Sequence, residues 1–249
     1  MTTKFFSQMQ IIAYNFGNNE AAVLFDNISQ YVDVIDGVKD NISFYATHTI
    51  LSGDRPDTLS YKLYGTTDYY WTFFLMNDHL RESGWPVNQS AINKTLKEKY
   101  PHRMVTTNSI IAKDFPVGTI VTGTSSGTVG TIVKRNLEMG QMVIDTVDDN
   151  NYSPTETLVY TSTEGAVYTA TLIKESLQYD AVHHYEDANG VHVDLPLYDF
   201  GNVPSGATAV TYRDRVENRN QQLKEISVLK PNVVSRVVSE FSNFHKQVI

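Results

Sequence analysis

Two short helix patterns with a glycine between them constrain the fold of this chain more than any other feature of its sequence. Pro56 suits the first position of a helix, where its missing N–H costs nothing. Gly65 stands where that helix must end, because glycine adopts the positive φ of a helix terminus without strain. A second helix pattern follows at once, with Thr66 or Thr67 as its cap, and Asn77 closes it.

Extended segments flank this helix pair. Residues 42–51 (ISFYATHTIL) are dense in β-branched and aromatic side chains, which predicts a strand. Residues 84–87 (GWPV) return the chain to an extended conformation after the second helix. The sequence therefore predicts a compact βααβ unit at about residues 42–88. The side chains expected to face its core are Leu59, Leu63, Tyr64, Tyr70, Trp71, Phe74 and Leu75.

The motifs of this unit resemble the LysM pattern, in which a Gly-Asp-Thr-Leu motif opens the first helix and an Asn closes the second. The matching elements are Gly53-Asp54, the run DTLS at residues 57–60, the run LYG at residues 63–65, and Asn77. Arg55 and Pro56 are two additional residues that depart from the ordinary glycan-binding LysM motif.

A narrower resemblance includes these two residues. Residues 52–78, followed by Gly84-Trp85, are similar to the LysM-containing baseplate wedge subunit of T-even-like contractile-tailed bacteriophages. Phe5-Phe6 near the start of the chain and residues 217–226 before its last helix fit the same family. The resemblance covers about residues 1–100 and 211–249.

This resemblance implies a structural protein of the virion tail, assembled in the host cytoplasm. It would be a non-enzymatic clamp that binds other baseplate wedge proteins and helps to join adjacent wedges around the hub, without catalytic residue, cofactor or metal. The main alternative is a LysM module that binds a glycan such as peptidoglycan. The Arg-Pro insertion, the single LysM-like copy and the lack of signal-peptide features in residues 1–20 disfavour that alternative. A lysozyme-like tail enzyme would need a carboxylate pair, and no spacing of acidic residues singles one out.

Composition excludes further classes of function. Acidic residues outnumber basic ones 28 to 20, for a formal charge of −8, which disfavours nucleic acid as a partner because phosphate binding relies on clustered Lys and Arg. The chain has no Cys, so disulfides and thiolate chemistry are excluded. No stretch approaches the roughly 18 apolar residues that a membrane span requires.

Apolar residues recur at helix-like intervals near both ends of the chain. We expect two short helices before residue 42, and a long helix that Pro231 opens after a strand at Glu225–Leu229. The long helix must either cover its own domain or insert into another chain. The apolar positions are Phe5, Phe6, Met9, Ile12 and Ala13 in the first helix, Phe25, Ile28, Tyr31, Val32 and Ile35 in the second, and Val233, Val234, Val237, Val238, Phe241 and Phe244 in the last.

The middle of the chain contains an internal repeat. Residues 115–134 and 152–174 superpose at a shift of 38, which places Val121 on Val159 and Gly127 on Gly165. Each copy is a β-branched strand, a Ser/Thr/Gly turn and a second strand, which predicts a hairpin. Because a lone hairpin is marginal in water, the two copies should pack with a strand at residues 141–147.

The expected fold class is α+β: a LysM-like βααβ domain with flanking N- and C-terminal helices and an inserted all-β module, a small barrel or sandwich. The N-terminal helices and LysM-like domain are expected at residues 1–102, and the β-rich module at 103–210. Residues 211–249 form a C-terminal helical segment that packs on the first domain or on partners.

Spacing does not support metal or phosphate sites. Adjacent His183 and His184 should point to opposite faces of a strand, and Asn189-Gly190 favours a hairpin turn. The acidic run at residues 145–151 lacks the Gly and Glu of an EF-hand loop, and residues 123–127 lack the Gly-Lys-Ser/Thr ending of a phosphate loop. The densest group of potential metal ligands is His183, His184, Glu186, Asp187, His192 and Asp194.

Aromatic and arginine side chains are the candidates for partner binding. The aromatic residues of the second helix cannot all point inward, and Tyr and Trp are enriched at interfaces. The charged stretch at residues 212–220 is either a solvated helix held by local charge pairs or a docking segment whose arginines pair with neighbouring subunits. The candidates are Tyr69, Tyr70, Phe73, Trp85, Arg213, Arg215 and Arg219.

Overall fold

The computed structural model describes residues 11–15, 22–26, 39, 41–111, 114–195 and 203–247. The chain divides into two compact units, one of residues 1–88 and 219–249 and the other of residues 89–218. The sequence places the boundaries near residues 102 and 210. In the structure, helix α5 (Gln89–Lys99) and residues 212–218 of helix α6 (Tyr212–Gln222) belong to the second unit.

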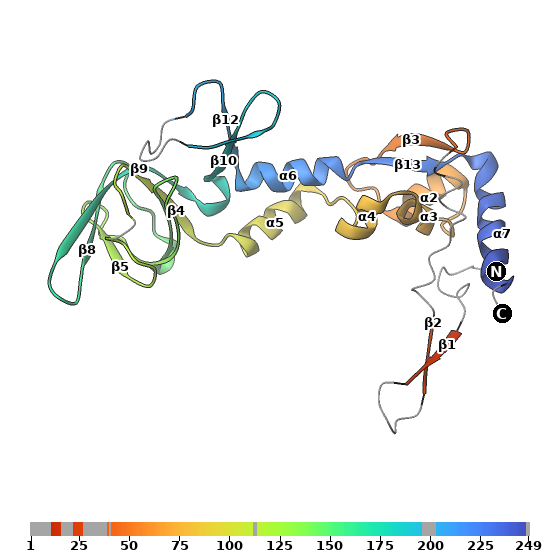
Figure 1. Cartoon of the computed structure of the whole chain (residues 1–249), viewed down its shortest axis with the longest axis horizontal. Helices are drawn as coiled ribbons and strands as arrows, with labels where there is room; N and C mark the ends of the chain where they lie inside the picture. Colours follow the sequence, from red (N-terminus) through yellow and green to blue (C-terminus); the bar gives the residue numbers. More distant parts are fainter. Residues whose placement is uncertain are drawn as a thin grey trace. The chain divides into compact units, whose positions relative to one another are not determined.

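A two-stranded antiparallel sheet forms the centre of the first unit (Figure 1). Strand β3 (Tyr45–Thr49) pairs with strand β13 (Glu225–Leu229), in a register that runs from Thr49 opposite Glu225 to Tyr45 opposite Leu229. The prediction of a second strand directly after Gly84 is wrong, because residues 84–88 contain no strand. Pro86 has no N–H to give to a ladder, and the backbone of Val87 is hydrogen-bonded by the side chain of Asn220.

Three helices follow β3 in this unit: α2 (Pro56–Tyr64), α3 (Trp71–Met76) and α4 (Asp78–Ser83). The ends of α2 are as predicted, since Pro56 occupies its first position and Gly65 follows it with φ 73°. The prediction that the second helix starts at Thr66 or Thr67 is wrong. The hydroxyl of Thr66 accepts the N–H of Asp68 in a local turn, and the helix begins only at Trp71. Helix α4 is absent from the sequence-based prediction.

The final helix α7 (Pro231–Gln247) packs on its own unit. The rings of Trp71 and Phe241 lie 5.1 Å apart, and the side chain of Phe244 lies outside the described residues. A second cluster beside the sheet joins Leu59 and Phe73 to Ile226 and Val228. The cluster under α7 consists of Trp71, Leu75, Met76, Leu229, Val234, Val237, Val238 and Phe241.

Two strands occupy the described part of the region before residue 42, where helices are expected. Strand β1 (Ile11–Tyr14) pairs antiparallel with β2 (Val23–Asp26), so the helix prediction is wrong at Ile12, Ala13 and Phe25. Apolar spacing over so few residues does not separate a helix from a strand, and both runs are rich in β-branched or aromatic residues. The other residues of the two predicted helices, Phe5, Phe6, Met9, Ile28, Tyr31, Val32 and Ile35, lie outside the described residues.

A closed six-stranded barrel forms most of the second unit, with the strand order β4-β7-β6-β5-β8-β9. Both predicted hairpins are present, as β5–β6 and β8–β9, and they are joined by pairing of their equivalent first strands β5 and β8. Strand β4, which the sequence does not reveal, completes the barrel between β7 and β9. The strands are β4 (Arg103–Thr107), β5 (Ile120–Gly123), β6 (Val129–Asn136), β7 (Gln141–Thr146), β8 (Thr157–Thr161) and β9 (Val167–Leu177).

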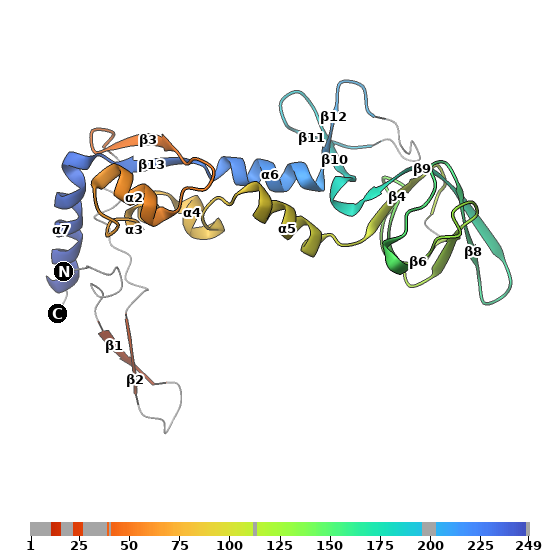
Figure 2. The ribbon, with the colours of Figure 1, turned by 180° about the vertical axis from the view of Figure 1, so that it is seen from behind.

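A three-stranded sheet belongs to the same unit, in the order β11-β10-β12 (Figure 2). It consists of β10 (Val182–Glu186), β11 (His192–Val193) and β12 (Thr208–Thr211). The hairpin predicted around Asn189-Gly190 connects β10 to β11, with the N–H of Gly190 donated to the carbonyl of Asp187. Single 3-10 turns lie at Val147–Asp149 and Gln178–Asp180.

Candidate partner-binding surfaces

The outer edge of β13 is occupied by side chains of its own unit. The Asn77 amide, which is 5% exposed, accepts the N–H of Ser227 at 2.8 Å and donates to the carbonyl of Ser227 at 2.8 Å. The hydroxyl of Tyr64 donates to the carbonyl of Leu229 at 3.0 Å, and burial raises the pKa of Tyr64. This edge is therefore closed to a further strand.

The outer edge of β3 is different. Because Ser227 turns its N–H and C=O toward Asn77, its pair with Thr47 is of the non-hydrogen-bonded type, and Thr47 turns its own backbone groups away from β13. Tyr45 and Thr49 share this orientation, two residues away on either side. Within the described ranges, the backbone of these three residues has no hydrogen-bond partner on that side. Thr47 and Thr49 are also exposed, so β3 presents a free strand edge.

Two of the four aromatic candidates lie mostly inside the first unit. Phe73 is 0% exposed, and the prediction that it contacts a partner is wrong, because no part of its side chain reaches the surface. Trp85 is half-buried, with its ring centroid 6.0 Å from that of Phe73. Its indole N–H donates to the carbonyl of Asp54 at 2.7 Å. Trp85 therefore fastens the loop before α2 to the core.

The two tyrosines at the start of α3 differ in exposure. Tyr69 is half-buried, and its ring meets that of Tyr64 edge-on at 6.0 Å. Tyr70 immediately precedes α3 and is 38% exposed. Of the four aromatic candidates, Tyr70 is the most accessible to a partner.

The three candidate arginines all have partners within their own units. Arg213 pairs with Asp180 at 2.8 Å, donates to the Asn93 side chain at 3.0 Å and lies 5.0 Å from the ring of Tyr179. The hydrogen bond to Asp180 is the main cause that raises the pKa of Arg213. Arg219 donates to the Ser83 hydroxyl at 2.9 Å. Arg219 is exposed and Arg213 only partly so.

Arg215 begins a chain of hydrogen bonds through two histidines. Its guanidinium donates to Nε2 of His183 at 2.6 Å, so the proton of neutral His183 sits on Nδ1. That nitrogen lies 3.0 Å from Nδ1 of His184, whose Nε2 then donates to Glu186 at 2.8 Å. One arrangement of protons satisfies every link, from arginine to carboxylate, with both histidines neutral.

The environment of His183 favours its neutral form. Burial is the main cause that lowers the pKa of His183 to about 4, and the charge of Arg215 adds to it. The expectation that His183 and His184 point to opposite faces is wrong, because an irregularity in the register of β10 between Val182 and His184 brings the two rings together. The other ionisable or charged groups around the pair are Tyr212, His192, Lys134, Glu138 and Glu186.

Metal binding finds no support in this arrangement. Among the residues that the structure describes, no group of three or more His, Cys, Asp or Glu side chains is placed to hold a metal ion. The acidic run at residues 145–151 forms a 3-10 turn in which Asp148 and Asp149 are exposed at positive φ. No described helix is both long and apolar enough to cross a membrane.

Comparison with known protein families relates the first part of the chain to phage baseplates. Residues 1–113 match the family model described as Base plate wedge protein 53. No curated protein matches the chain. The match covers β3, the three helices after it, α5 and β4, and it supports a structural role in a phage tail baseplate.

The free edge of β3 is the feature that sequence reasoning missed. The strand itself is predicted from its composition, but which of its edges is covered depends on β13, whose paired residues lie about 180 positions later in the chain. The polar Thr47 and Thr49 are the one local signal in the sequence, and polar residues at alternate positions are typical of any surface strand.

Proposed function

We propose that this chain is a non-enzymatic clamp of a contractile-tail baseplate wedge, which binds other wedge proteins and helps to join adjacent wedges around the tail hub. The observation that carries the proposal is the match of residues 1–113 to Base plate wedge protein 53. The resemblance of residues 52–78 to the LysM-containing wedge subunit of T-even-like phages supports it further. Assembly would take place in the host cytoplasm, before the virion is complete.

The LysM-like motif serves this function as a fold determinant. Asp54 accepts the N–H of Leu51 and pairs with Lys62 at 2.6 Å, which holds the loop that leads into α2. Thr58 accepts the N–H of Arg55 at 3.0 Å and caps that helix. Gly65 ends α2, and Asn77 binds β13. We infer a LysM-like unit whose second strand is supplied by the C-terminal segment, which makes that segment necessary for folding of the first unit.

We assign partner binding in the first unit to the free edge of β3. An extended segment of a neighbouring wedge protein would add a strand there, through the outward backbone groups of Tyr45, Thr47 and Thr49. Backbone pairing of this kind depends little on side-chain identity, so it suits a scaffold that joins several proteins. Tyr70 and Arg219, both exposed, are the candidate side chains of this unit that we assign to further partner contacts.

The β-rich second unit is a module inserted in the sequence between the two parts of the first unit. Its own arginine candidates, Arg213 and Arg215, are used internally to hold α6 against neighbouring elements. We therefore expect them to act on partners only indirectly, by fixing the orientation of the helix.

A proline scan of β3 tests the edge assignment. Thr47→Pro removes an N–H that β13 does not use, so the fold should remain while strand addition is blocked. Thr47→Ala keeps the N–H and is the matched control, whereas His48→Pro removes a donor that β13 uses and should destabilise the unit. Each variant would replace the wild-type chain in infected cells, and the number of complete baseplates would be counted by electron microscopy.

We expect Thr47→Pro to lower the number of complete baseplates by about tenfold or more, because a central part of the interface would be lost. Thr47→Ala should leave this number near that of the wild type. Thr49→Pro repeats the test at a second outward position. Normal assembly with both proline variants would overturn the edge assignment. The broader function is tested by affinity purification of the tagged chain from infected cells, and recovery of no baseplate protein would overturn it.

A further inference from the structure

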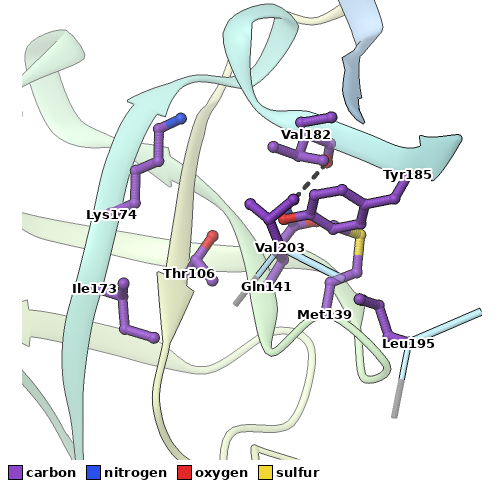
Figure 3. Close-up of a pocket in the computed structure, with 10 residues that line it drawn as sticks. Thr106, Met139, Gln141, Ile173, Lys174, Val182, Tyr185, Leu195 and Val203 are labelled. Atoms are coloured by element: carbon purple, nitrogen blue, oxygen red, sulfur yellow. Dashed lines mark hydrogen bonds between the residues drawn. The ribbon is translucent and has the colours of Figure 1, made fainter. Parts of the chain in front are cut away.

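Strand β9 consists of two parts with different surroundings. Residues 172–177 pair with β4, and Ile173 and Lys174 line a pocket of the second unit together with Tyr185 and Val203 (Figure 3). Residues 167–171 lie past the end of that pairing, in a hairpin with β8 that extends beyond the other barrel strands (Figure 1). The hairpin therefore has a side that β4 does not cover.

The backbone groups on that side belong to Val167 and Thr169. The N–H of Ser162 donates to the carbonyl of Ala166 at 2.8 Å, so the even-numbered residues that follow face β8 and the odd-numbered ones face away from it. Among the described residues, no hydrogen bond uses the outward N–H or C=O of Val167 and Thr169. Val167 is 62% exposed and Thr169 is exposed as well, so a partner can reach this edge.

The sequence of this edge offers no protection against pairing. Natural proteins protect open strand edges with a charged residue, a proline or a bulge. Residues 167–171 (VYTAT) contain no charge and no proline, and they pair with β8 in an uninterrupted register. Glu164 and Lys174 lie outside this run. Such an edge is typical of a strand that pairs with another chain.

A second copy of the chain matches the free groups of this edge. In an antiparallel pair of β9 strands with a two-fold axis at Tyr168, Val167 of each copy lies opposite Thr169 of the other. Each copy contributes two free N–H and two free C=O groups, which form four backbone hydrogen bonds across the axis. No free group of the two residues is left without a partner.

The side chain of Tyr168 fits the same two-fold arrangement. It is half-buried, and its ring stacks on that of Tyr160 with centroids 5.8 Å apart and planes at 16°. Across the axis the two Tyr168 residues form a non-hydrogen-bonded pair, the type in which opposite side chains are closest. The stacked pair of rings in each copy then becomes a row of four.

Charge is also complementary in this arrangement. Glu164 lies at the hairpin turn and Lys174 lies toward the other end of the strand, and both are exposed. Because the two strands run in opposite directions, Glu164 of each copy comes toward the end that carries Lys174 of the other. Opposite charges therefore flank the uncharged contact.

From these observations we propose that the β9 edge at residues 167–169 is a self-association surface, through which two copies of the chain pair as antiparallel strands. The contact is small, so the dimer should be weak, with a dissociation constant on the order of 100 µM. It is separate from the edge of β3, and it would form whether or not the chain acts in a baseplate.

Sedimentation of the full chain from about 10 to 500 µM tests the dimer. Thr169→Pro removes an N–H that neither β8 nor β4 uses, so the hairpin should remain folded. Because the contact is two-fold, this change removes two of the four hydrogen bonds, and the dissociation constant should rise about tenfold or more. Thr169→Ala keeps the N–H and is the matched control. Thr47→Pro blocks the other free edge and should leave the dimer unchanged.

Three results would overturn the assignment. A chain that stays monomeric over the whole concentration range has no such contact. A dimer that Thr169→Pro does not weaken uses another surface, and a dimer that only Thr47→Pro weakens uses the edge of β3. If Thr169→Pro lowers the melting temperature, an introduced cysteine decides the question.

The chain has no Cys, so one introduced thiol reports the register of the two strands. Tyr168→Cys places the thiols of two copies opposite each other, with their Cα atoms about 4.5 Å apart, which is within the range of a disulfide. Val167→Cys is the matched control, because Thr169 of the other copy lies opposite it. With diamide as the oxidant, we expect covalent dimers to form about ten times faster in Tyr168→Cys. Equal rates for the two variants would exclude the two-fold pairing at Tyr168.

Discussion

Asn77 and Ser227 lie 150 positions apart in the sequence and are joined by two hydrogen bonds of 2.8 Å, one in each direction. The amide of Asn77 takes the place that a peptide group of a third strand would have. Asn220 binds both backbone groups of Val87 in the same manner, at 2.8 and 3.0 Å. Two asparagine side chains thus join the distant parts of the first unit.

Removing the Asn77 amide should destabilise the first unit. Asn77→Ala loses the two bonds to Ser227 and a third, from Nδ2 to the carbonyl of Phe73, and leaves buried backbone groups without partners. We expect a loss of about 2–4 kcal/mol in the free energy of unfolding, measured by urea denaturation. Asn243→Ala, at an exposed position of α7, is the control and should change stability by less than about 0.5 kcal/mol. A loss as small as the control's would show that Asn77 does not hold β13.

The barrel depends on a buried carboxylate at a turn. Glu156, 5% exposed, accepts the N–H groups of Ser125 and Ser126 at 2.9 Å each. Burial alone would raise the pKa of Glu156, but these bonds outweigh it and lower the pKa. Glu156→Gln should lower stability by about 2 kcal/mol at pH 7, since bonds to a charged acceptor are the stronger ones.

The contribution of Glu156 to stability should decrease as the pH falls. A carboxyl group with a lowered pKa contributes stability that is complete above the unfolded pKa, near 4.3, and is lost as the pH falls through the folded pKa. The difference between wild type and Glu156→Gln should therefore shrink in acid. Melting curves from pH 7 to pH 3 measure it, and a constant difference would contradict this account.

The histidine chain predicts a second pH dependence, in the second unit. The folded pKa of His183 is about 4, below the unfolded value near 6.5, so folding favours the neutral ring. That contribution is complete above pH 6.5 and is lost as the pH falls toward 4. His183→Gln removes the titrating group, and its stability should fall less than that of wild type between these pH values. Parallel curves for the two proteins would rule out His183 as the source.

The free protein should not bind peptidoglycan. Asp54 and Thr58 of the LysM-like motif are hydrogen-bonded in a turn and a helix cap, so on the function we propose they are expected to stabilise the local fold and not to bind glycan. Co-sedimentation with purified peptidoglycan, beside a glycan-binding LysM protein as a positive control, should leave this chain in the supernatant. Pelleting that chito-oligosaccharides reverse would instead favour the glycan-binding alternative.

Local signals in the sequence predict part of the local structure. Pro56 and Gly65 mark the ends of α2, and the repeat predicts both hairpins of the barrel, because turn and cap preferences act over a few residues. Partner choice between distant strands could not be predicted this way. The sequence predicts strand β13 but not its pairing with β3, and it predicts the second strand of the unit at residues 84–87 instead.

The candidate site was harder to predict than the fold. An aromatic-rich helix shows that some rings are buried, but Phe73 and Tyr70 differ in exposure only through packing on distant elements. The contact of His183 with His184 depends on one irregularity in the register of β10, which no spacing rule reveals.

The amide of Asn77 also limits how many strands a partner can add to the β3–β13 sheet. A sheet with two open edges can be extended from both sides, and repeated addition leads to filaments. Here the outer edge of β13 is bound by the side chains of Asn77 and Tyr64. Side chains cannot continue a strand ladder, so no strand can be added at this edge. The β3–β13 sheet of each copy can then accept one added strand, and strand addition at this sheet does not propagate.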